Sequence, residues 1–353
     1  MKQQNRYINL LLTILVSMLI GALLMWMLGY NPFEAYYYLF RGAFVGKLSL
    51  GTTLQKFVPL LLTAMAFAIS SRVGVFNVGV EGELYLGGIA AAWVGYNFVS
   101  LPGPIHILFC FGAAMLVGSG WAFIPGFLKS GWHVNEVCVT ILMNYVAKYF
   151  TSYLVNGPLS AKTGVPQTPR IVDNVKLLQF LKPSQTNTGL FIAIGVVIFL
   201  FWLMNHTTEG YKYTTVGLNP SHAEFVGINP KKIMIRAMLL SGAIGGIAGC
   251  IEILGVYNYF LDNFSMNLAF DGMLAALIVK SDIKMVPVMA FFLAVLKSGA
   301  LGMERYTGVP KAVVDMIIAI FIIFACMDTL FVFHKKRKAK SVKTLSAVSG
   351  GKG

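Results

Sequence analysis

Three polar side chains lie close together in an otherwise apolar part of the chain. Residues 73–88 read VGVFNVGVEGELYLGG, and they place Asn77, Glu81 and Glu83 between two apolar runs. An amide group both donates and accepts hydrogen bonds, and a carboxylate accepts them from hydroxyl groups. These residue types at this spacing could therefore bind a small polar solute, provided that the surrounding elements hold them together.

The composition places these residues in a membrane protein. Of the 353 residues, 57% are hydrophobic and 12% are charged, whereas soluble globular proteins are about one-quarter charged. The last twenty residues, HKKRKAKSVKTLSAVSGGKG, hold seven Lys and Arg residues, which is half of the net charge of +14. A basic segment after an apolar helix indicates the cytoplasmic side of a membrane. We therefore expect an integral membrane protein with a basic cytoplasmic tail at 334–353.

Apolar runs of membrane-spanning length recur along the chain. They predict an all-α polytopic membrane protein with about ten transmembrane helices, of which at least about eight are true crossings. Both termini are expected in the cytoplasm, because Lys and Arg gather between alternate spans, and the first helix is expected to be retained rather than cleaved. Spans 2–5 and 7–10 could form an inverted repeat, an arrangement common among membrane transporters. The predicted helices cover residues 8–28, 52–71, 84–98, 106–128, 135–155, 189–205, 231–256, 268–280, 285–301 and 311–333.

The polar stretch falls where the second predicted span ends and the third begins. Gly74, Gly79 and Gly82 are expected to break the helix there, and irregular backbone at membrane depth is tolerated only beside protein or a water-filled cavity. Ionisable groups inside a bilayer cost about 3 kcal/mol each and face the protein interior or water. We expect the break to line a pathway across the membrane, although each polar group could instead only fix helix packing. The candidate pathway residues are Phe76, Asn77, Glu81, Glu83, Asn144 and Asp271.

A cytoplasmic loop at 206–232 contains its own helix signals. Asn219 followed by Pro220 is typical of a helix start, and Gly227 is typical of a helix end. The loop is therefore expected to hold one short helix, Pro220–Val226, and this helix is either a docking element or an ordinary capped loop. The next span contains SGAIGGIAG (241–249), whose GxxxG spacings predict close helix packing.

Signatures of catalysis, nucleotide binding and metal binding are missing from the sequence. There is no G-x-x-x-x-G-K-[ST] loop, so the chain is not expected to bind ATP by that route. There is likewise no HExxH motif and no Ser/His/Asp set. The four cysteines, Cys110, Cys138, Cys250 and Cys326, lie in apolar runs without metal-binding spacing and are expected to be buried core residues. We expect neither enzyme activity nor a cofactor nor a metal ion in this chain.

Several stretches resemble one protein family. VGVFNVGVEGELYLGG resembles the G-x-x-N-x-G-x-E-G signature of permease subunits in bacterial ABC importers for nucleosides and simple sugars. VGLNPSHAEFVGINPKKIMIRAMLLSGAIGGIAG (216–249), VNEVCVTILMNY (134–145) and FDGMLAALIVKSDIKMVPVMA (270–290) are similar to further motifs of that family. The Asn-Glu form of the first motif is closer to nucleoside permeases than to ribose-type or branched-chain amino-acid permeases. The chain departs from the pattern at Ala269, where the family usually has Gly, and at IVK (278–280).

The resemblance implies the fold, partners and cargo of this chain. Residues 1–333 would form a single permease domain in a bacterial plasma membrane, which works by alternating access and contains the coupling loop 206–232. Its partners would be a second related permease, separate ABC ATPase subunits that bind the ATP, and an extracytoplasmic substrate-binding lipoprotein; membrane lipids would surround it, and no nucleic acid is expected. The cargo would be a nucleoside, or alternatively ribose, another monosaccharide or a branched-chain amino acid; a stand-alone carrier or channel is the remaining alternative. The residues implied to contact the ATPase are Gly217, Asn219, Pro220, Ala223, Glu224, Gly227 and Ile228.

Overall fold

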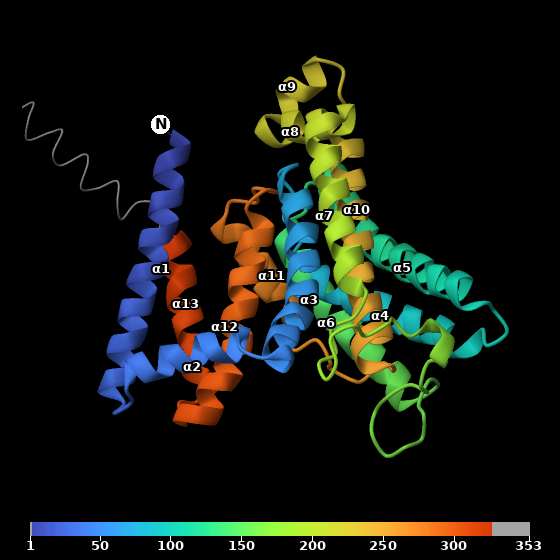
Figure 1. Ribbon diagram of the computed structural model, residues 1–353. Helices are drawn as coiled ribbons and strands as arrows, with labels where there is room; N and C mark the ends of the chain where they lie inside the picture. Colours follow the sequence, from blue (N-terminus) through green and yellow to red (C-terminus); the bar gives the residue numbers. More distant parts are fainter. Residues whose placement is uncertain (1, 327–353) are drawn as a thin grey trace, which may run out of the picture. The chain divides into compact units, whose positions relative to one another are not determined.

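The computed structural model describes residues 2–326, which are almost entirely helical (Figure 1). They divide into two compact units, one formed by Met1–Tyr38 together with Met303–Gly353 and the other by Leu39–Gly302. The helices are α1 (Lys2–Met27), α2 (Pro32–Phe44), α3 (Lys47–Ser71), α4 (Val80–Asn97), α5 (Gly103–Trp132), α6 (Glu136–Asn156), α7 (Gly189–His206), α8 (Thr208–Leu218), α9 (Pro220–Phe225), α10 (Pro230–Glu252), α11 (Leu268–Ile278), α12 (Val286–Thr307) and α13 (Lys311–Cys326). The tail at 334–353 lies outside the described residues.

The smaller unit is built on a helix pair. The helices α1 and α13 pack against each other, and a Cβ at Gly21 would lie 2.6 Å from Cγ1 of Ile317, so glycine permits this close approach. Near the start of α2 and the end of α12, the rings of Tyr38 and Tyr306 stack with their centroids 4.8 Å apart. Aromatic stacking of this kind stabilises the pair beyond the apolar area it buries.

The helix α10 forms the centre of the larger unit, where it contacts α3, α4 and α5. Gly242 and Gly118 face each other so closely that a Cβ on either would overlap the carbonyl oxygen of the other. Gly246 approaches the backbone of Ala114 in the same way. The small residues of the 241–249 segment therefore let the backbones touch, which confirms the close packing predicted from the GxxxG spacing.

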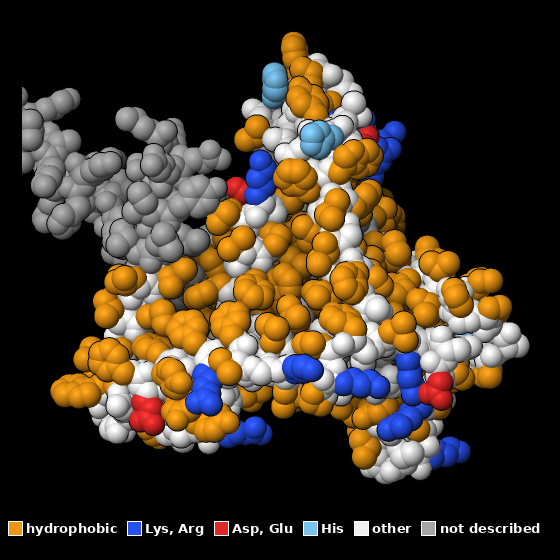
Figure 2. All heavy atoms as spheres, in the orientation of Figure 1, with side chains coloured by type: hydrophobic (Ala, Val, Ile, Leu, Met, Phe, Trp, Pro, Cys, Tyr) orange, Lys and Arg blue, Asp and Glu red, His pale blue; other side chains and the backbone are white. Residues whose placement is uncertain are grey.

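Five helices are long and apolar enough to cross a membrane: α3, α5, α7, α12 and the continuous helix Pro230–Tyr257, which consists of α10 and the π-helical turn after it. Two shorter apolar helices cover Ile14–Met27 and Leu268–Ile278. Each predicted span corresponds to a helix, with ends shifted by a few residues. The total of about ten crossings, the orientation of the termini and the inverted repeat stay predictions. Figure 2 shows hydrophobic side chains over much of the visible face of α7, whose exposed residues include Phe191, Ile198 and Trp202, as expected for a surface that contacts lipid.

Three local predictions are wrong. The helix α4 begins at Val80, so Gly82, Glu81 and Glu83 belong to its first turn, and the break covers only residues 72–79. The loop at 206–232 holds two helices rather than one, because α8 precedes the predicted α9. Cys138 is exposed, whereas Cys110 and Cys250 are buried.

Candidate functional site

The amide of Asn77 is the centre of a buried network between the break and two helices. Its Nδ2 donates to Oε1 of Glu83 at 2.7 Å and to Oγ of Ser241 at 2.8 Å. Its Oδ1 accepts from the backbone N of Gly79 at 3.0 Å. Ser241 in turn donates to the carbonyl oxygen of Ala66 at 2.7 Å. Asn77 thus connects Glu83 on α4 with Ser241 on α10, and Ser241 extends the network to α3. Every polar group of the Asn77 amide has a partner.

Glu83 has one carboxylate oxygen satisfied and one without a partner. Its side chain is buried, and Oε2 has no hydrogen-bond partner among the described residues. This oxygen lies beside Gly245, where a Cβ would come within 2.6 Å of it. A buried acceptor without a donor is costly, so this oxygen is suited to accept a hydrogen bond from a hydroxyl group or a water molecule.

The carboxylate of Glu81 contacts a different helix. Its two oxygens accept from the backbone N of Asn267 at 3.2 Å and of Ala269 at 2.8 Å, and the side chain is buried. Glu81 therefore caps the N-terminus of α11, where the first N–H groups have no partner within the helix. In this state both oxygens bind the protein itself.

The amide of Asn144, on α6, is likewise bound by backbone groups. Its Oδ1 accepts from the N of Gly82 at 2.8 Å, and its Nδ2 donates to the carbonyl oxygen of Val78 at 2.9 Å. Asn144 thus fixes α6 to the start of α4. Both polar atoms of its amide therefore bind backbone groups of this chain.

Asp271 forms an ion pair that the sequence did not reveal. Its Oδ2 bonds to Nζ of Lys297, on α12, and each side chain is 22% exposed. Lys56, on α3, donates to the carbonyl oxygen of Lys297 at 2.8 Å. The signal that could have identified Lys297 is its position near the middle of an otherwise apolar span, because a charge at that depth needs a partner.

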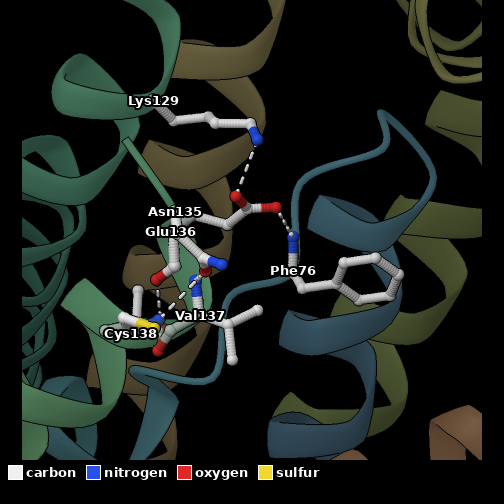
Figure 3. Close-up of polar contacts among 7 residues, drawn as sticks. Phe76, Lys129, Asn135, Glu136, Val137 and Cys138 are labelled. Carbon is white, nitrogen blue, oxygen red and sulfur yellow. Dashed lines mark hydrogen bonds and ion pairs between the residues drawn. The ribbon is translucent and has the colours of Figure 1, made fainter. Parts of the chain in front are cut away.

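Phe76, in the middle of the break, makes its polar contact with α6 rather than with the Asn77 network. Its backbone N donates to Oε1 of Glu136 at 3.4 Å, and Oε2 of the same carboxylate pairs with Nζ of Lys129 at 2.8 Å (Figure 3). The ring of Phe76 is partly exposed and lies near that of Phe67, with their centroids 6.0 Å apart. Glu136 thus ties the break to the ends of α5 and α6.

The loop at 206–232 forms a compact two-helix element, α8 and α9, that lies at one end of α7 and α10 (Figure 1). Oδ1 of Asn219 accepts from the N of His222 at 3.1 Å, and Pro220 is the first residue of α9. Gly227 has a φ of 83°, and the N of Ile228 donates to the carbonyl oxygen of Ala223 at 2.9 Å. The predicted start and stop signals are therefore confirmed.

This two-helix element touches the first residue of the break, Arg72. Gly217, at the end of α8, packs so closely against the carbonyl group of Arg72 that a Cβ would overlap it. Nε of Arg72 also donates to the carbonyl oxygen of Ser281 at 3.1 Å. A movement of α8 therefore acts directly on the residues that lead into the Asn77 network.

The surface of α8 and α9 exposes both apolar and charged side chains. Leu218 and Phe225, which the sequence analysis did not select, are highly exposed, as is Glu224, whereas Ala223 is buried. The carboxylate of Glu209 accepts from Nζ of Lys212 at 2.7 Å, a hydrogen bond that lowers the pKa of Glu209 below its ordinary value. An exposed apolar surface on a short capped helix is suited to contact a partner protein.

Comparisons with known proteins identify the family of this chain. The family model for branched-chain amino acid transport system permease components matches residues 49–326. The chain is 35% identical to the guanosine ABC transporter permease protein NupP of Bacillus subtilis over 93% of this chain and 96% of that protein. It is 31% identical to the nucleoside ABC transporter permease protein NupB of Lactococcus lactis over 96% and 95%. It is 32% identical to the glucose ABC transporter permease protein TsgB13 of Haloferax volcanii over 91% and 87%.

A second permease from the same Lactococcus lactis strain, the nucleoside ABC transporter permease protein NupC, is 25% identical over 55% of this chain and 63% of that protein. Similar pairs of permeases therefore exist in at least one relative's organism. The family model covers most of the chain, and three relatives above 30% identity match it over at least 87% of their lengths, so the chain belongs to the permease components of ABC transport systems.

Proposed function

We propose that this chain is a permease subunit through which an ATP-driven importer brings nucleosides across a bacterial plasma membrane. The observation that carries the proposal is the similarity to guanosine and nucleoside permeases along more than nine-tenths of the chain. A glucose permease is nearly as similar, so a simple sugar is the second candidate cargo. Branched-chain amino acids remain the third, since the family model bears their name.

The proposed pathway runs past the break and the first turn of α4. Phe76, Asn77, Glu81, Glu83, Asn144 and Asp271 are the residues we assign to it. In the present state most of their polar atoms bind each other or the backbone, while Oε2 of Glu83 has no partner among the described residues. Alternating access requires that some of these contacts open to water in turn. We infer that Asn77 and Glu81 exchange their protein partners as the helices move.

The proposed drive comes from partner subunits that bind ATP. The chain has no phosphate-binding loop, and ABC ATPase subunits would dock on the exposed side of α9, beside Glu224 and Gly227. The remaining residues of this group would hold the helix in place: Gly217, Asn219, Pro220, Ala223 and Ile228. The contact between Gly217 and Arg72 would pass the motion on to the break. A second permease, paired as NupB and NupC suggest, and an extracytoplasmic lipoprotein complete the importer.

Uptake by the reconstituted importer tests this function. Vesicles that contain the two permeases, the ATPase and the lipoprotein should accumulate labelled guanosine when ATP is supplied, and an excess of unlabelled glucose should not compete. Competition by glucose without any by guanosine would assign the cargo to the sugars. Uptake that persists without ATP but stops when the proton gradient is dissipated would identify a secondary carrier instead.

The docking role has its own matched pair of variants. Phe225→Lys places a charge on the 89% exposed ring of α9, whereas Leu178→Lys places one on a 76% exposed side chain that lies before the start of α7, outside the two-helix element. We expect Phe225→Lys to lose the stimulation of ATPase activity by loaded lipoprotein and Leu178→Lys to retain it. Equal stimulation in both variants would contradict the docking role of α9.

A further inference from the structure

The ion pair of Asp271 and Lys297 lies deep within the span that α12 forms. Lys297 is the twelfth of the 22 residues of α12, which places it about 17 Å along a helix about 33 Å long. The side chains of both residues are 22% exposed. Charged groups near the middle of a membrane are costly against lipid, so they face protein or water and mark the routes of solutes. The exposed part of this pair therefore suits a wet surface rather than a lipid-facing one.

Asp271 reaches this depth because α11 is short. The helix has 11 residues and is about 16 Å long, and residues 279–285 join it to the start of α12. The ion pair joins the beginning of α11 to the middle of α12. Residues 258–267, which precede α11, form no helix, and irregular backbone at this depth is tolerated only beside protein or a water-filled cavity.

The first turn of α11 also connects the pair to another residue of the proposed pathway. Asp271 belongs to this turn, and the carboxylate of Glu81 accepts from the backbone N of Asn267 and of Ala269 at the start of the same helix. The two carboxylates thus meet one end of one short helix. The ion pair is therefore continuous with the region around Glu81 rather than a separate feature of the surface.

Both partners of the ion pair are fixed to α3. Gly272, next to Asp271, lies so close to Oγ1 of Thr63 that a Cβ would overlap it. Nζ of Lys56 donates to the carbonyl oxygen of Lys297 at 2.8 Å. Groups that are already held in place lose less conformational freedom when they bind a ligand, so the pair is preorganised for binding.

The charges around the pair balance at their ordinary ionisation states. The carboxylates of Glu81 and Asp271 match the ammonium groups of Lys56 and Lys297, which suits a polar cargo without net charge. A carboxylate accepts hydrogen bonds and an ammonium group donates them. A vicinal diol offers two hydroxyl donors and their oxygen lone pairs to such a pair. Ribose and monosaccharides contain this group, and the side chains of branched-chain amino acids do not.

We propose that Asp271 and Lys297 form a hydroxyl-binding subsite of the pathway, in which the carboxylate accepts from the vicinal diol of a ribose and Nζ of Lys297 donates to one diol oxygen. This inference rests on the proposed function, because it takes Asp271 as a pathway residue and a nucleoside as the cargo. It makes Lys297 a specificity-determining residue. A cargo that lacks one hydroxyl group loses a hydrogen bond to a charged partner, which corresponds to about tenfold in binding.

Two cargoes that differ by one hydroxyl group test the subsite in the reconstituted importer. The lipoprotein is saturated with guanosine or with 2′-deoxyguanosine, so that its own preference does not enter, and the rates of ATP-driven uptake are compared. We expect the unchanged importer to take up guanosine about tenfold faster. In the double variant Asp271→Asn, Lys297→Met the ratio of the two rates should fall close to one. Glu304→Gln, which changes an exposed carboxylate near the end of α12, should keep the ratio of the unchanged importer.

The ratio of rates separates recognition of the cargo from stability of the fold. A purely structural role of the pair would lower both uptake rates by the same factor, so an unchanged ratio in the double variant would overturn the subsite. Asp271→Glu keeps the charge and shifts the carboxylate by one methylene group, and its ratio should also fall. This variant provides the test if the double variant does not assemble.

Two further results would overturn the subsite and leave the proposed function intact. One is equal uptake of the two nucleosides by the unchanged importer. The other is loss of the second permease when the double variant is purified, which would place the pair in a subunit interface. Uptake of glucose but of neither nucleoside would overturn the nucleoside cargo alone. The comparison of glucose with 2-deoxyglucose would then test the diol, and a preference for glucose that the double variant retains would overturn the subsite as well.

Discussion

The carboxylate of Glu81 lies 2.8 Å from the backbone N of Ala269 and 3.2 Å from that of Asn267. These contacts place an acid from α4 on the N-terminus of α11, where N–H groups lack helical partners and the helix dipole favours negative charge. Asn267 itself, which precedes the helix, makes no side-chain cap. Glu81 thus supplies from a distant part of the chain the cap that the local sequence does not provide.

Removal of this cap should destabilise the permease. Glu81→Ala leaves two N–H groups without an acceptor and should cost about 1–2 kcal/mol, visible as a lower apparent Tm of the purified protein. Glu81→Gln retains one acceptor oxygen and should lose less. An unchanged Tm in Glu81→Ala would show that the cap does not stabilise the fold. A loss of uptake in Glu81→Gln at an unchanged Tm would instead support the pathway role.

The helices were predictable from sequence because long apolar runs and cap residues act locally. Asn219, Asn229 and Gly227 each mark a helix end as their residue types predict. Gly82 was misassigned because a glycine suits both a helix break and a close contact between helices. In the structure it lies in α4, and its lack of a side chain leaves room for Asn144 and Ala147.

The helix α8 was not predicted because its order comes from tertiary contacts. Its sequence, TEGYKYTTVGL, contains three Thr and two Gly residues, which are weak helix formers. In the structure Tyr213 and Val216 are buried, and Glu209 pairs with Arg236 on α10. A single sequence does not show that these residues have partners there.

The polar residues of the site were recognisable by type, but their partners were not. Asn77 and Ser241 are 164 residues apart, and Glu81 and Ala269 are 188 apart. Their pairing depends on the register of α4, α10 and α11 against one another, which no local pattern specifies. For the same reason Lys297 escaped notice until α11 and α12 were seen together.

The ion pair of Asp271 and Lys297 should be more costly to halve than to remove. Lys297→Met leaves a carboxylate without this partner, and because both groups are partly exposed we expect a loss of about 2 kcal/mol, below the value for fully buried pairs. The double variant Asp271→Asn, Lys297→Met should recover part of this loss. Apparent Tm values of Asp271→Asn, Lys297→Met and the double variant measure the coupling. Additive losses in the double variant would show that the two side chains do not interact.

Acid should weaken the link between α8 and α10. The hydrogen bonds from Lys212, on α8 itself, and from Arg236, on α10, lower the pKa of Glu209 from its ordinary value of 4.5. The stabilisation is therefore present above that value and is lost as the pH falls through the lower pKa of the folded state. At pH 7 we expect Glu209→Gln to lose about 0.5 kcal/mol, as for exposed ion pairs.

Thermal unfolding at several pH values measures this difference. It should shrink as the medium becomes more acidic than pH 4.5, and Glu224→Gln, an exposed acid on α9, should show no comparable difference at neutral pH. A loss in Glu209→Gln that stays constant through the acid range would contradict the link.

The contact between Gly217 and Arg72 should set how well ATP hydrolysis is coupled to transport. Gly217→Ala introduces a Cβ that overlaps the carbonyl oxygen of Arg72, whereas Gly195→Ala introduces one on α7 that has nothing within 4 Å. Both changes replace a helical glycine by a better helix former, so they differ only in the contact they meet. We expect Gly217→Ala to push α8 away from Arg72, the first residue of the break. ATP-driven uptake should then fall about tenfold, which corresponds to about 1.4 kcal/mol.

Basal ATPase activity should change less than uptake in this variant, because the ATPase subunits themselves are unaltered. The ratio of cargo molecules imported to ATP hydrolysed in vesicles measures the effect, and it should be unchanged in Gly195→Ala. An unchanged ratio in Gly217→Ala would mean that the force passes by another route. Another contact of α8 is the ion pair of Glu209 with Arg236, on α10. Because Ser241 is also on α10, a force could reach the Asn77 network through this helix without passing through Arg72.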